Sequence, residues 1–147
     1  MPNYKYGTKI EGAKAQLYNV DSSYKDLAEV CGNIQGKKLL DAEKLLTDVA
    51  SGEKPILFKK FNKRMAHRAE LGGKKGRYPH KSAKIVLQVL ENAAANAVTK
   101  GMNKEKLMVS HASANKQDIY ERSAPRGRWR VNNYETARIE IVLTEGS

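Results

Sequence analysis

Apolar residues recur at three- and four-residue steps in three stretches of the chain, which is the spacing of an amphipathic helix. Their apolar positions are Tyr24, Leu27, Cys31 and Ile34; Ala42, Leu45, Leu46 and Val49; and Ala83, Leu87, Leu90, Ala94 and Ala97, with Val86, Ala93 and Val98 beside the last set. Gly36, Gly52 and Gly101 follow these stretches, and glycine commonly ends a helix. The pattern predicts three helices, the third starting after Pro79.

Two polar positions are placed to start the first two helices. Ser23 and Asp26 have the S-x-x-D spacing of a weak form of the capping box. Asp41 immediately precedes the second apolar stripe. We therefore expect Ser23 to cap the first helix and Asp41 the second.

Both ends of the chain read as strands. Residues 13–20 predict a short first strand, and residues 106–121 and 134–145 predict two longer ones. In the last strand the apolar and polar positions alternate, which is the period of a half-buried strand. The alternating residues are Ile139, Ile141 and Leu143 against Arg138, Glu140 and Thr144, with Leu107 and Val109 expected opposite them at the base.

The facing ends of these two long strands predict a projecting hairpin. Residues 113–135 are too polar to pack on a core. If they stay paired, they extend about a dozen residues, on the order of 40 Å at strand rise, beyond the body. An isolated hairpin is only marginally stable in water, so this arm indicates a partner that orders it.

The turn of this hairpin, Ser123–Arg130, reads "SAPRGRWR" and holds the only tryptophan of the chain. Exposed arginines at a proline–glycine turn are common surface chemistry, but an exposed tryptophan is not. Arginine binds phosphate bidentately and stacks on bases, and indole also stacks on bases. On a projecting hairpin this composition favours insertion into RNA.

The uneven distribution of charge along the chain is the strongest indication of function. The chain has 147 residues and a net charge of +11, from 27 lysines and arginines against 16 acids. Residues 54–84 hold eleven of the bases but only one acid, Glu70, so this segment carries +10 of that charge. A solvated surface is the usual fate of scattered charge, but so uneven a block favours a polyanionic partner, and nucleic acid rewards each lysine–phosphate contact by counterion release.

The basic block has little period and contains Gly72, Gly73, Gly76 and Pro79, so it is expected to be a long loop, with Phe58 and Phe61 anchoring it to the core. In "LGGKKGRYPHK" the glycines allow backbone N–H groups to approach phosphates. Tyr78 has two equally weighted roles, stacking on a base or ribose and packing that fixes the loop.

The residues give little support for a membrane span, a reactive thiol, a metal site or catalysis. The single domain-sized chain has no apolar run long enough to span a membrane and begins with no secretory signal, which predicts an intracellular protein. Cys31 lies on an apolar stripe and is expected to be a buried thiol. The histidines His67, His80 and His111 lack metal-ligand spacing, so neither a metal nor another cofactor is expected. No nucleophile or general base stands in a catalytic arrangement, so we expect no enzyme.

The order of these features resembles the universal large-subunit ribosomal protein family numbered twenty-two, called seventeen in older eukaryotic naming. The resemblance rests on "IQGKKLLDAEKLLTDV", on "FKKFNKRMAHR" and "GGKKGRYPHKSAKIVLQVLENAAANAVTKG", which are similar to the archaeal–eukaryotic branch, and on "SAPRGRWR" with "ARIEIVLTE". It extends from about Ala13 to Glu145. The sequence departs from the family pattern at Gln35, at Trp129 and in the returning arm "VNNYE".

This resemblance implies an α+β fold, with three helices packed on a small three-stranded antiparallel sheet and a long protruding β-hairpin. It divides the chain into a flexible N-terminal arm, 1–12, and a single RNA-binding domain, 13–147, which includes the basic loop 53–79 and the hairpin, about 107–144. The residues implied to bind RNA are Lys59, Lys60, Lys63, Arg64, Arg68, Lys74, Lys75, Arg77, Tyr78, Lys81, Lys84, Arg122, Arg126, Arg128, Trp129 and Arg130.

The implied function is that of a structural constituent of the large ribosomal subunit, with no enzymatic activity, that binds large-subunit rRNA and lines the peptide exit tunnel with its hairpin tip. The implied partners are that RNA, neighbouring ribosomal proteins at the tunnel and the nascent polypeptide, and no membrane. The implied location is the cytoplasm, in ribosomes assembled in the nucleolus if the source is eukaryotic. Two alternatives remain: a free nucleic-acid-binding regulator that uses the basic block, and, less favoured, a small enzyme acting on a phosphorylated substrate.

Overall fold

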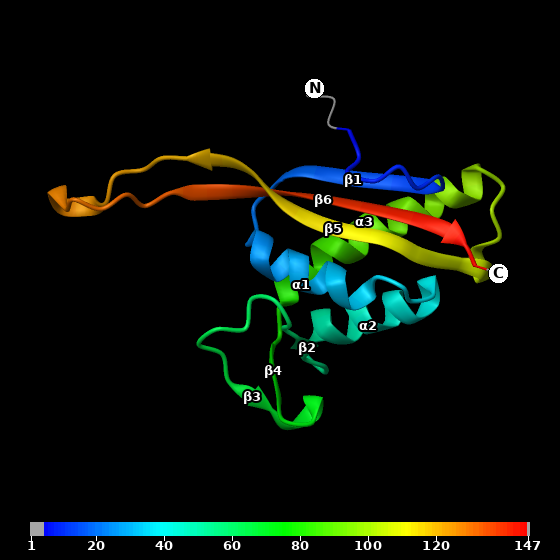
Figure 1. Cartoon of the computed structure of the whole chain (residues 1–147), viewed down its shortest axis with the longest axis horizontal. Coiled ribbons are helices and arrows are strands. Elements are labelled where there is room, and N and C mark those ends of the chain that lie inside the picture. The colour runs from blue at the N-terminus through cyan, green and yellow to red at the C-terminus, as the bar shows by residue number, and fades with distance from the viewer. Residues whose placement is uncertain (1–4, 147) are drawn as a thin grey trace.

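The computed structural model describes residues 5–146 and confirms the predicted α+β architecture, in which three helices cover an antiparallel three-stranded sheet (Figure 1). Its main elements are β1 (Ala13–Val20), α1 (Tyr24–Ile34), α2 (Leu39–Ser51), α3 (His80–Thr99), β5 (Leu107–Tyr120) and β6 (Tyr134–Glu145). The strand order is β1-β6-β5, so the last strand of the chain is central. Val109 pairs with Leu143 at the base of the β5–β6 ladder, as expected.

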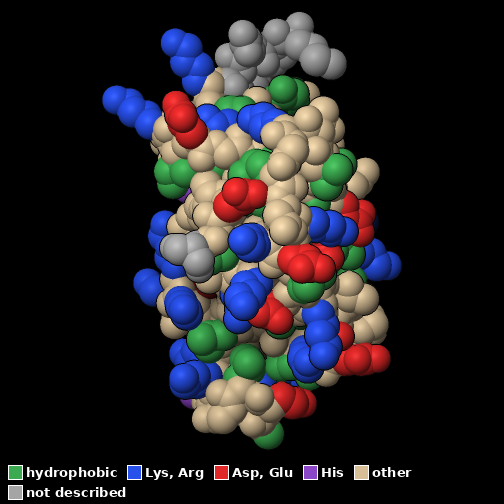
Figure 2. Space-filling view, turned by 90° about the vertical axis from the view of Figure 1, so that its right-hand side faces the viewer, with side chains coloured by type: hydrophobic (Ala, Val, Ile, Leu, Met, Phe, Trp, Pro, Cys, Tyr) green, Lys and Arg blue, Asp and Glu red, His purple; other side chains and the backbone are tan. Residues whose placement is uncertain are grey.

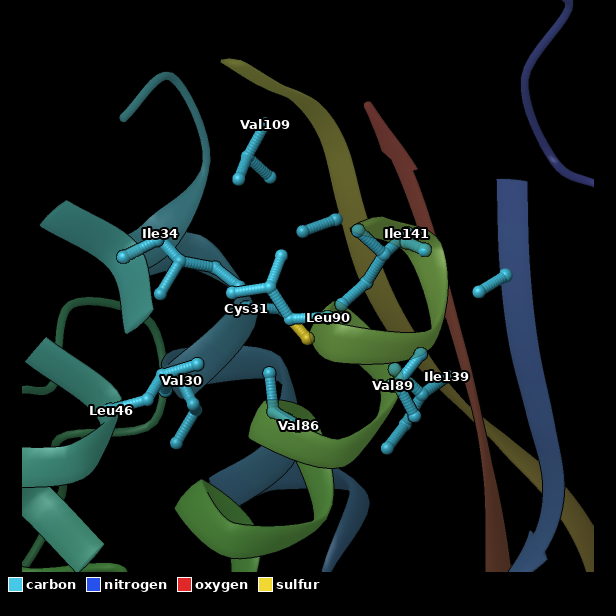
Figure 3. Close-up of a cluster of buried hydrophobic side chains, with 14 of the residues drawn as sticks. Val30, Cys31, Ile34, Leu46, Val86, Val89, Leu90, Val109, Ile139 and Ile141 are labelled. Carbon is cyan, nitrogen blue, oxygen red and sulfur yellow. The ribbon is translucent and has the colours of Figure 1, made fainter. Parts of the chain in front are cut away.

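The hydrophobic core lies between the sheet and the helices (Figure 3). Ile139 and Ile141 of β6 are fully buried against α1 and α3, where Cys31 and Leu90 meet them. Cys31 has no exposed surface, and its burial raises the pKa of the thiol to about 12. The prediction that this thiol is a buried apolar side chain is therefore confirmed.

The second helix is held mainly by the third helix, and a short turn links it to the sheet. The N–H of Gly36 donates to the carbonyl of Val109 at 2.8 Å, and the N–H of Val109 donates to Lys37 at 2.9 Å. This pairing fixes the chain just before α2, so the helix begins at Leu39, with Lys38 at its N-cap. Gly52 ends α2 in the left-handed conformation, at φ 93°, as its position predicted.

Both predicted side-chain caps are wrong. Ser23 occupies the N-cap of α1, but its hydroxyl accepts no hydrogen bond from the helix; Ser22 instead pairs with Ser82 at 3.0 Å. Asp41 lies inside the first turn of α2, because the pairing with β5 starts that helix at Leu39. A tertiary contact therefore sets the start of α2.

One residue that was predicted to lie on the apolar stripe of α3 does not lie there. Val98 is 56% exposed, whereas Val89, outside the predicted stripe, is buried. Val98 is one residue further round the helix than the buried Ala97, a rotation of about 100° that turns it to solvent. The buried face of α3 instead follows Ala83, Val86 and Leu90 towards Ala97.

Glu140, predicted on the polar side of β6, is only 2% exposed. Its carboxylate accepts hydrogen bonds from the N–H of Gly7, from His111 Nε2 and from the hydroxyl of Ser113, each at about 3.0 Å. Burial by itself raises the pKa of Glu140, but these three donors outweigh it and hold the pKa below its ordinary value. Gly7 therefore lies against the sheet, while Met1–Tyr4 of the predicted arm fall outside the described residues.

The basic segment predicted to be a long loop folds into a second, small antiparallel sheet. It contains β2 (Ile56–Leu57), β3 (His67–Arg68) and β4 (Lys74–Arg77) in the order β2-β4-β3, with one 3-10 turn, Ala69–Leu71. Strands of two to four residues offer too few alternations to be recognised in sequence. The expected anchor is confirmed at Phe58, which is 2% exposed.

The projecting hairpin is confirmed (Figure 1). The pairing of β1 with β6 ends where Val20 meets Ala137. Beyond that point β5 and β6 pair only with each other, as far as Tyr120 and Tyr134, and carry the tip well away from the helices.

Candidate nucleic-acid interface

The residues predicted to bind RNA form two separate surfaces. One lies on and around the β2-β4-β3 sheet, below α1 and α2, and the other lies at the far end of the hairpin (Figure 1). All of these residues are exposed except Arg68, Lys75 and Tyr78, which are half-buried. We call the first group, from Lys59 to Lys84, the basic surface, and the second, from Arg122 to Arg130, the tip.

Glu29 of α1 holds the start of the basic surface in place. The side chain is only 4% exposed, and its carboxylate accepts the backbone N–H groups of Lys59, Lys60 and Phe61 at 2.9, 2.7 and 2.7 Å. A carboxylate that accepts several N–H groups forms strong, charge-assisted hydrogen bonds. The backbone is thereby fixed while the lysine side chains remain free to project.

Glu29 was missed by sequence reasoning, although the sequence contains a signal for it. It lies between Leu27 and Val30 on the face of α1 that packs into the core. An acid at such a position is seldom buried unless it has a partner. Its partners, however, come from residues about thirty positions away, which a single sequence does not reveal.

Further hydrogen bonds join α1 to the small sheet and hold that sheet together. The amide of Asn33 on α1 donates to the carbonyl of Leu57 at 2.8 Å, and the N–H of Phe58 donates to Lys75 at 3.1 Å. Gly76 is buried beneath β2, where an added Cβ would lie 2.5 Å from the carbonyl oxygen of Ile56. The basic surface is therefore a rigid extension of the core.

Tyr78 is engaged within the protein. The Arg68 guanidinium lies 5.4 Å from the centre of its ring, and the ring stacks on His80 at 6.3 Å. The hydroxyl of Tyr78 donates to Glu70 at 3.2 Å, while Arg68 Nε donates to the carbonyl of Gly76. These contacts support the packing role for Tyr78, and contact with a base stays a prediction.

Lys81 is also paired within the protein. Its ammonium lies 3.1 Å from Asp21, which in addition accepts a hydrogen bond from the hydroxyl of Tyr134 at 3.0 Å. The hydrogen bond from Lys81, followed by that from Tyr134, holds the pKa of Asp21 below its ordinary value. This network ties the start of α3 to the root of the hairpin, so Lys81 serves a structural role as well as adding charge.

The tip is a short turn that exposes its large side chains. A 3-10 turn, Pro125–Gly127, reverses the chain, as the sequence predicted, with both Arg126 and Gly127 at positive φ. The N–H of Ala124 donates to the carbonyl of Arg130 at 3.0 Å, which closes the loop. Trp129 is fully exposed, and Ala124 is the buried residue of the turn.

The end of the molecule opposite the tip has a different character. Figure 2 shows lysine, arginine, acidic and hydrophobic side chains intermixed on that face. Intermixed charges are typical of an ordinary solvated surface. The segregation of positive charge seen in the sequence therefore corresponds to particular places in the fold.

Within residues 5–146 no three histidine, cysteine or acidic side chains gather in a way that would hold a metal ion. None of the helices described there is both long and apolar enough to span a membrane.

The fold and its surfaces define the class of the protein: a small basic α+β domain that presents two cationic surfaces, one of them on an extended hairpin. The family model described as "Ribosomal protein L22p/L17e" matches residues 15–144. The chain therefore belongs to the L22p/L17e family of ribosomal proteins, which confirms the resemblance seen in the sequence.

Curated archaeal relatives agree over nearly their whole length. The chain is 42% identical to large ribosomal subunit protein uL22 of Methanocaldococcus jannaschii, covering 99% of this chain and 97% of the relative. It is 42% identical to the protein of that name from Archaeoglobus fulgidus, covering 95% and 92%, and 37% identical to that of Staphylothermus marinus, covering 99% of both. Membership of a ribosomal protein family agrees with the prediction that the chain is not an enzyme.

Proposed function

We propose that this protein is a structural constituent of the large ribosomal subunit and that it binds the RNA of that subunit. The observation that carries the proposal is a basic surface, fixed to the core by Glu29, on a fold whose relatives are named large ribosomal subunit proteins. Lysines on a fixed backbone bind RNA better than lysines on a mobile loop, because less backbone entropy is lost on binding. Most of the RNA affinity comes from this surface through contacts with phosphates.

The tip adds local contacts. Arg126, Arg128 and Arg130 reach phosphates and bases, and the fully exposed Trp129 stacks on an unpaired base or forms part of a wall. In this proposal the tip lines the peptide exit tunnel, where it meets the nascent polypeptide and neighbouring ribosomal proteins. An RNA environment explains why so much of the hairpin extends beyond β1 without support from its own core.

The proposed location is the ribosome in the cytoplasm. Assembly in the nucleolus stays a prediction for a eukaryotic source, and the relatives named above are archaeal.

Sedimentation of a cell extract tests the proposal. After a high-salt wash that removes loosely bound proteins, we expect the protein in the large-subunit fraction, at about one copy per subunit. Phosphate contacts alone weaken steeply as salt rises, so a protein that stays bound must also be held by packing and by hydrogen bonds within the folded RNA. Recovery only in light fractions would contradict the proposal and favour a free nucleic-acid-binding regulator.

A pair of charge variants tests the division of labour between the two surfaces. Replacing Arg126, Arg128 and Arg130 with alanine is expected to leave incorporation into subunits nearly normal and to alter the tunnel locally. Replacing Lys59, Lys60 and Lys63 with alanine removes the same charge from the basic surface and is expected to reduce incorporation. Loss of incorporation in the tip variant alone would refute this division.

A further inference from the structure

A groove lies between the start of α1 and the loop that follows β2. Its volume is about 510 Å³, which falls in the size range of sites for small ligands. Four cationic side chains line it, together with one carboxylate and one aromatic ring. These residues are Lys25, Lys60, Lys63, Arg77, Asp26 and Phe61.

The aromatic ring of the groove is held in position on one side and half-exposed on the other. Phe61 meets the ring of Tyr24 edge-to-face, with the ring centres 5.9 Å apart. Its backbone N–H is fixed by Glu29 at 2.7 Å. The ammonium groups of Lys25 and Lys60 lie 5.9 and 5.4 Å from the centre of the ring. Phe61 therefore combines a fixed, half-exposed ring with two cations placed over it, and aromatic rings and cations are the groups that hold unstacked bases.

The carboxylate of Asp26 supplies an acceptor at the same groove. Asp26 is half-buried in the first turn of α1, and partial burial raises its pKa, an effect that the charge of Arg77 opposes. A carboxylate that lines a groove with an aromatic ring accepts N–H groups from the edge of a base, as carboxylates do from cytosine N4. Phosphate alone would need the cations but neither Phe61 nor Asp26.

We propose that this groove binds one unpaired nucleotide of the large-subunit RNA. The base lies against Phe61 and donates an N–H to Asp26. Lys25, Lys63 and Arg77 bind the flanking phosphates. Lys25, on α1, lies outside the basic block, and the proposal rests on the ribosomal function proposed above.

The test probes the RNA of purified large subunits with a reagent that acylates flexible 2′-hydroxyl groups. Three kinds of subunit are compared: those with the wild-type protein, those with the variant Phe61→Leu and those with the variant Asp26→Asn. Leucine keeps the packing against Tyr24 but removes the stacking face, and asparagine keeps the shape of Asp26 but presents an N–H₂ group. Tyr18→Leu, on β1, and Lys44→Ala, on α2, are controls at residues that do not line the groove.

Reactivity is expected to rise at the same one or two nucleotides in both variants: by on the order of tenfold in Phe61→Leu, because a stacked base is held that strongly, and by less in Asp26→Asn, whose remaining oxygen can still accept an N–H. The controls are expected to match the wild type. Unchanged reactivity in both variants, with the protein present in the subunits, would overturn the groove proposal but not the ribosomal function. If Phe61→Leu does not enter subunits, the result with Asp26→Asn decides. Absence of the wild-type protein from subunits would overturn both proposals.

Discussion

Removal of the Glu29 carboxylate tests how the basic surface is held. The variant Glu29→Ala deprives the N–H groups of Lys59, Lys60 and Phe61 of their acceptors at once. Hydrogen bonds to a charged group are each worth roughly 1.5–3 kcal/mol, which sets an upper bound of about 5–9 kcal/mol for the three together. Because Lys59 and Lys60 are exposed, water replaces part of the loss when the loop opens, so we expect about 3 kcal/mol.

The conservative variant Glu29→Gln tests how much of the lost stability comes from the negative charge and from one of the two acceptor oxygens. Its remaining oxygen can still accept from Lys60 and Phe61, while its N–H₂ group faces the N–H of Lys59. We expect about half the loss of Glu29→Ala, because one acceptor and the negative charge are gone. Glu91→Ala is the control, since Glu91 is an exposed acid on α3.

Two measurements on the full-length protein check this prediction. Urea denaturation gives the change in the free energy of unfolding, and hydrogen exchange gives the protection of the amides of residues 59–61. We expect these amides to exchange much faster in Glu29→Ala even if part of the loss is confined to local opening. A loss below about 1 kcal/mol together with unchanged protection of these amides would refute the reasoning.

Three further predictions concern buried groups. The pKa of Glu140 is lowered in the folded protein, so its contribution to stability is present above its unfolded-state pKa and is lost as the pH falls through its folded-state pKa. Glu140→Gln should therefore cost about 1–3 kcal/mol at neutral pH and flatten the acid limb of stability measured by urea titration. An unchanged acid limb would contradict this. With its pKa raised to about 12, the Cys31 thiol should not react with a thiol reagent at pH 8 until the protein is denatured, and rapid reaction of the folded protein would show the burial to be wrong. Gly76→Ala places a Cβ 2.5 Å from the carbonyl oxygen of Ile56 and should cost about 1–3 kcal/mol in thermal unfolding, whereas a neutral result would mean that β2 and β4 are not packed this tightly.

The parts of the fold that could be predicted are those with long periodic patterns. The helices ending at Gly52 and Gly101 and the alternation along β6 each repeat over several turns or residue pairs, so local sequence is enough to identify them. The strands of the small sheet are too short to repeat. The start of α2 escaped prediction because pairing of the preceding turn with Val109 decides it, and this partner lies more than sixty residues away.

The candidate site could also be predicted only in part. Exposed charge can be counted from sequence, and the predicted lysines and arginines are indeed at the surface. The sequence did not reveal which polar groups are buried. Glu29 lies on a helix and Glu140 on a strand, and the local pattern around each contains no information about its distant hydrogen-bond partners. The cluster of Arg68 with Tyr78 and the pair of Lys81 with Asp21 likewise depend on chain segments brought together only by folding.

A density map of the assembled large subunit, at a resolution that shows side chains and nucleotides, tests the central proposal most directly. We predict RNA against the basic surface from Lys59 to Arg77 and a hairpin held by RNA, with its tip at the wall of the exit tunnel. A map in which these lysines and arginines face solvent, or in which the protein is absent from the subunit, would contradict it.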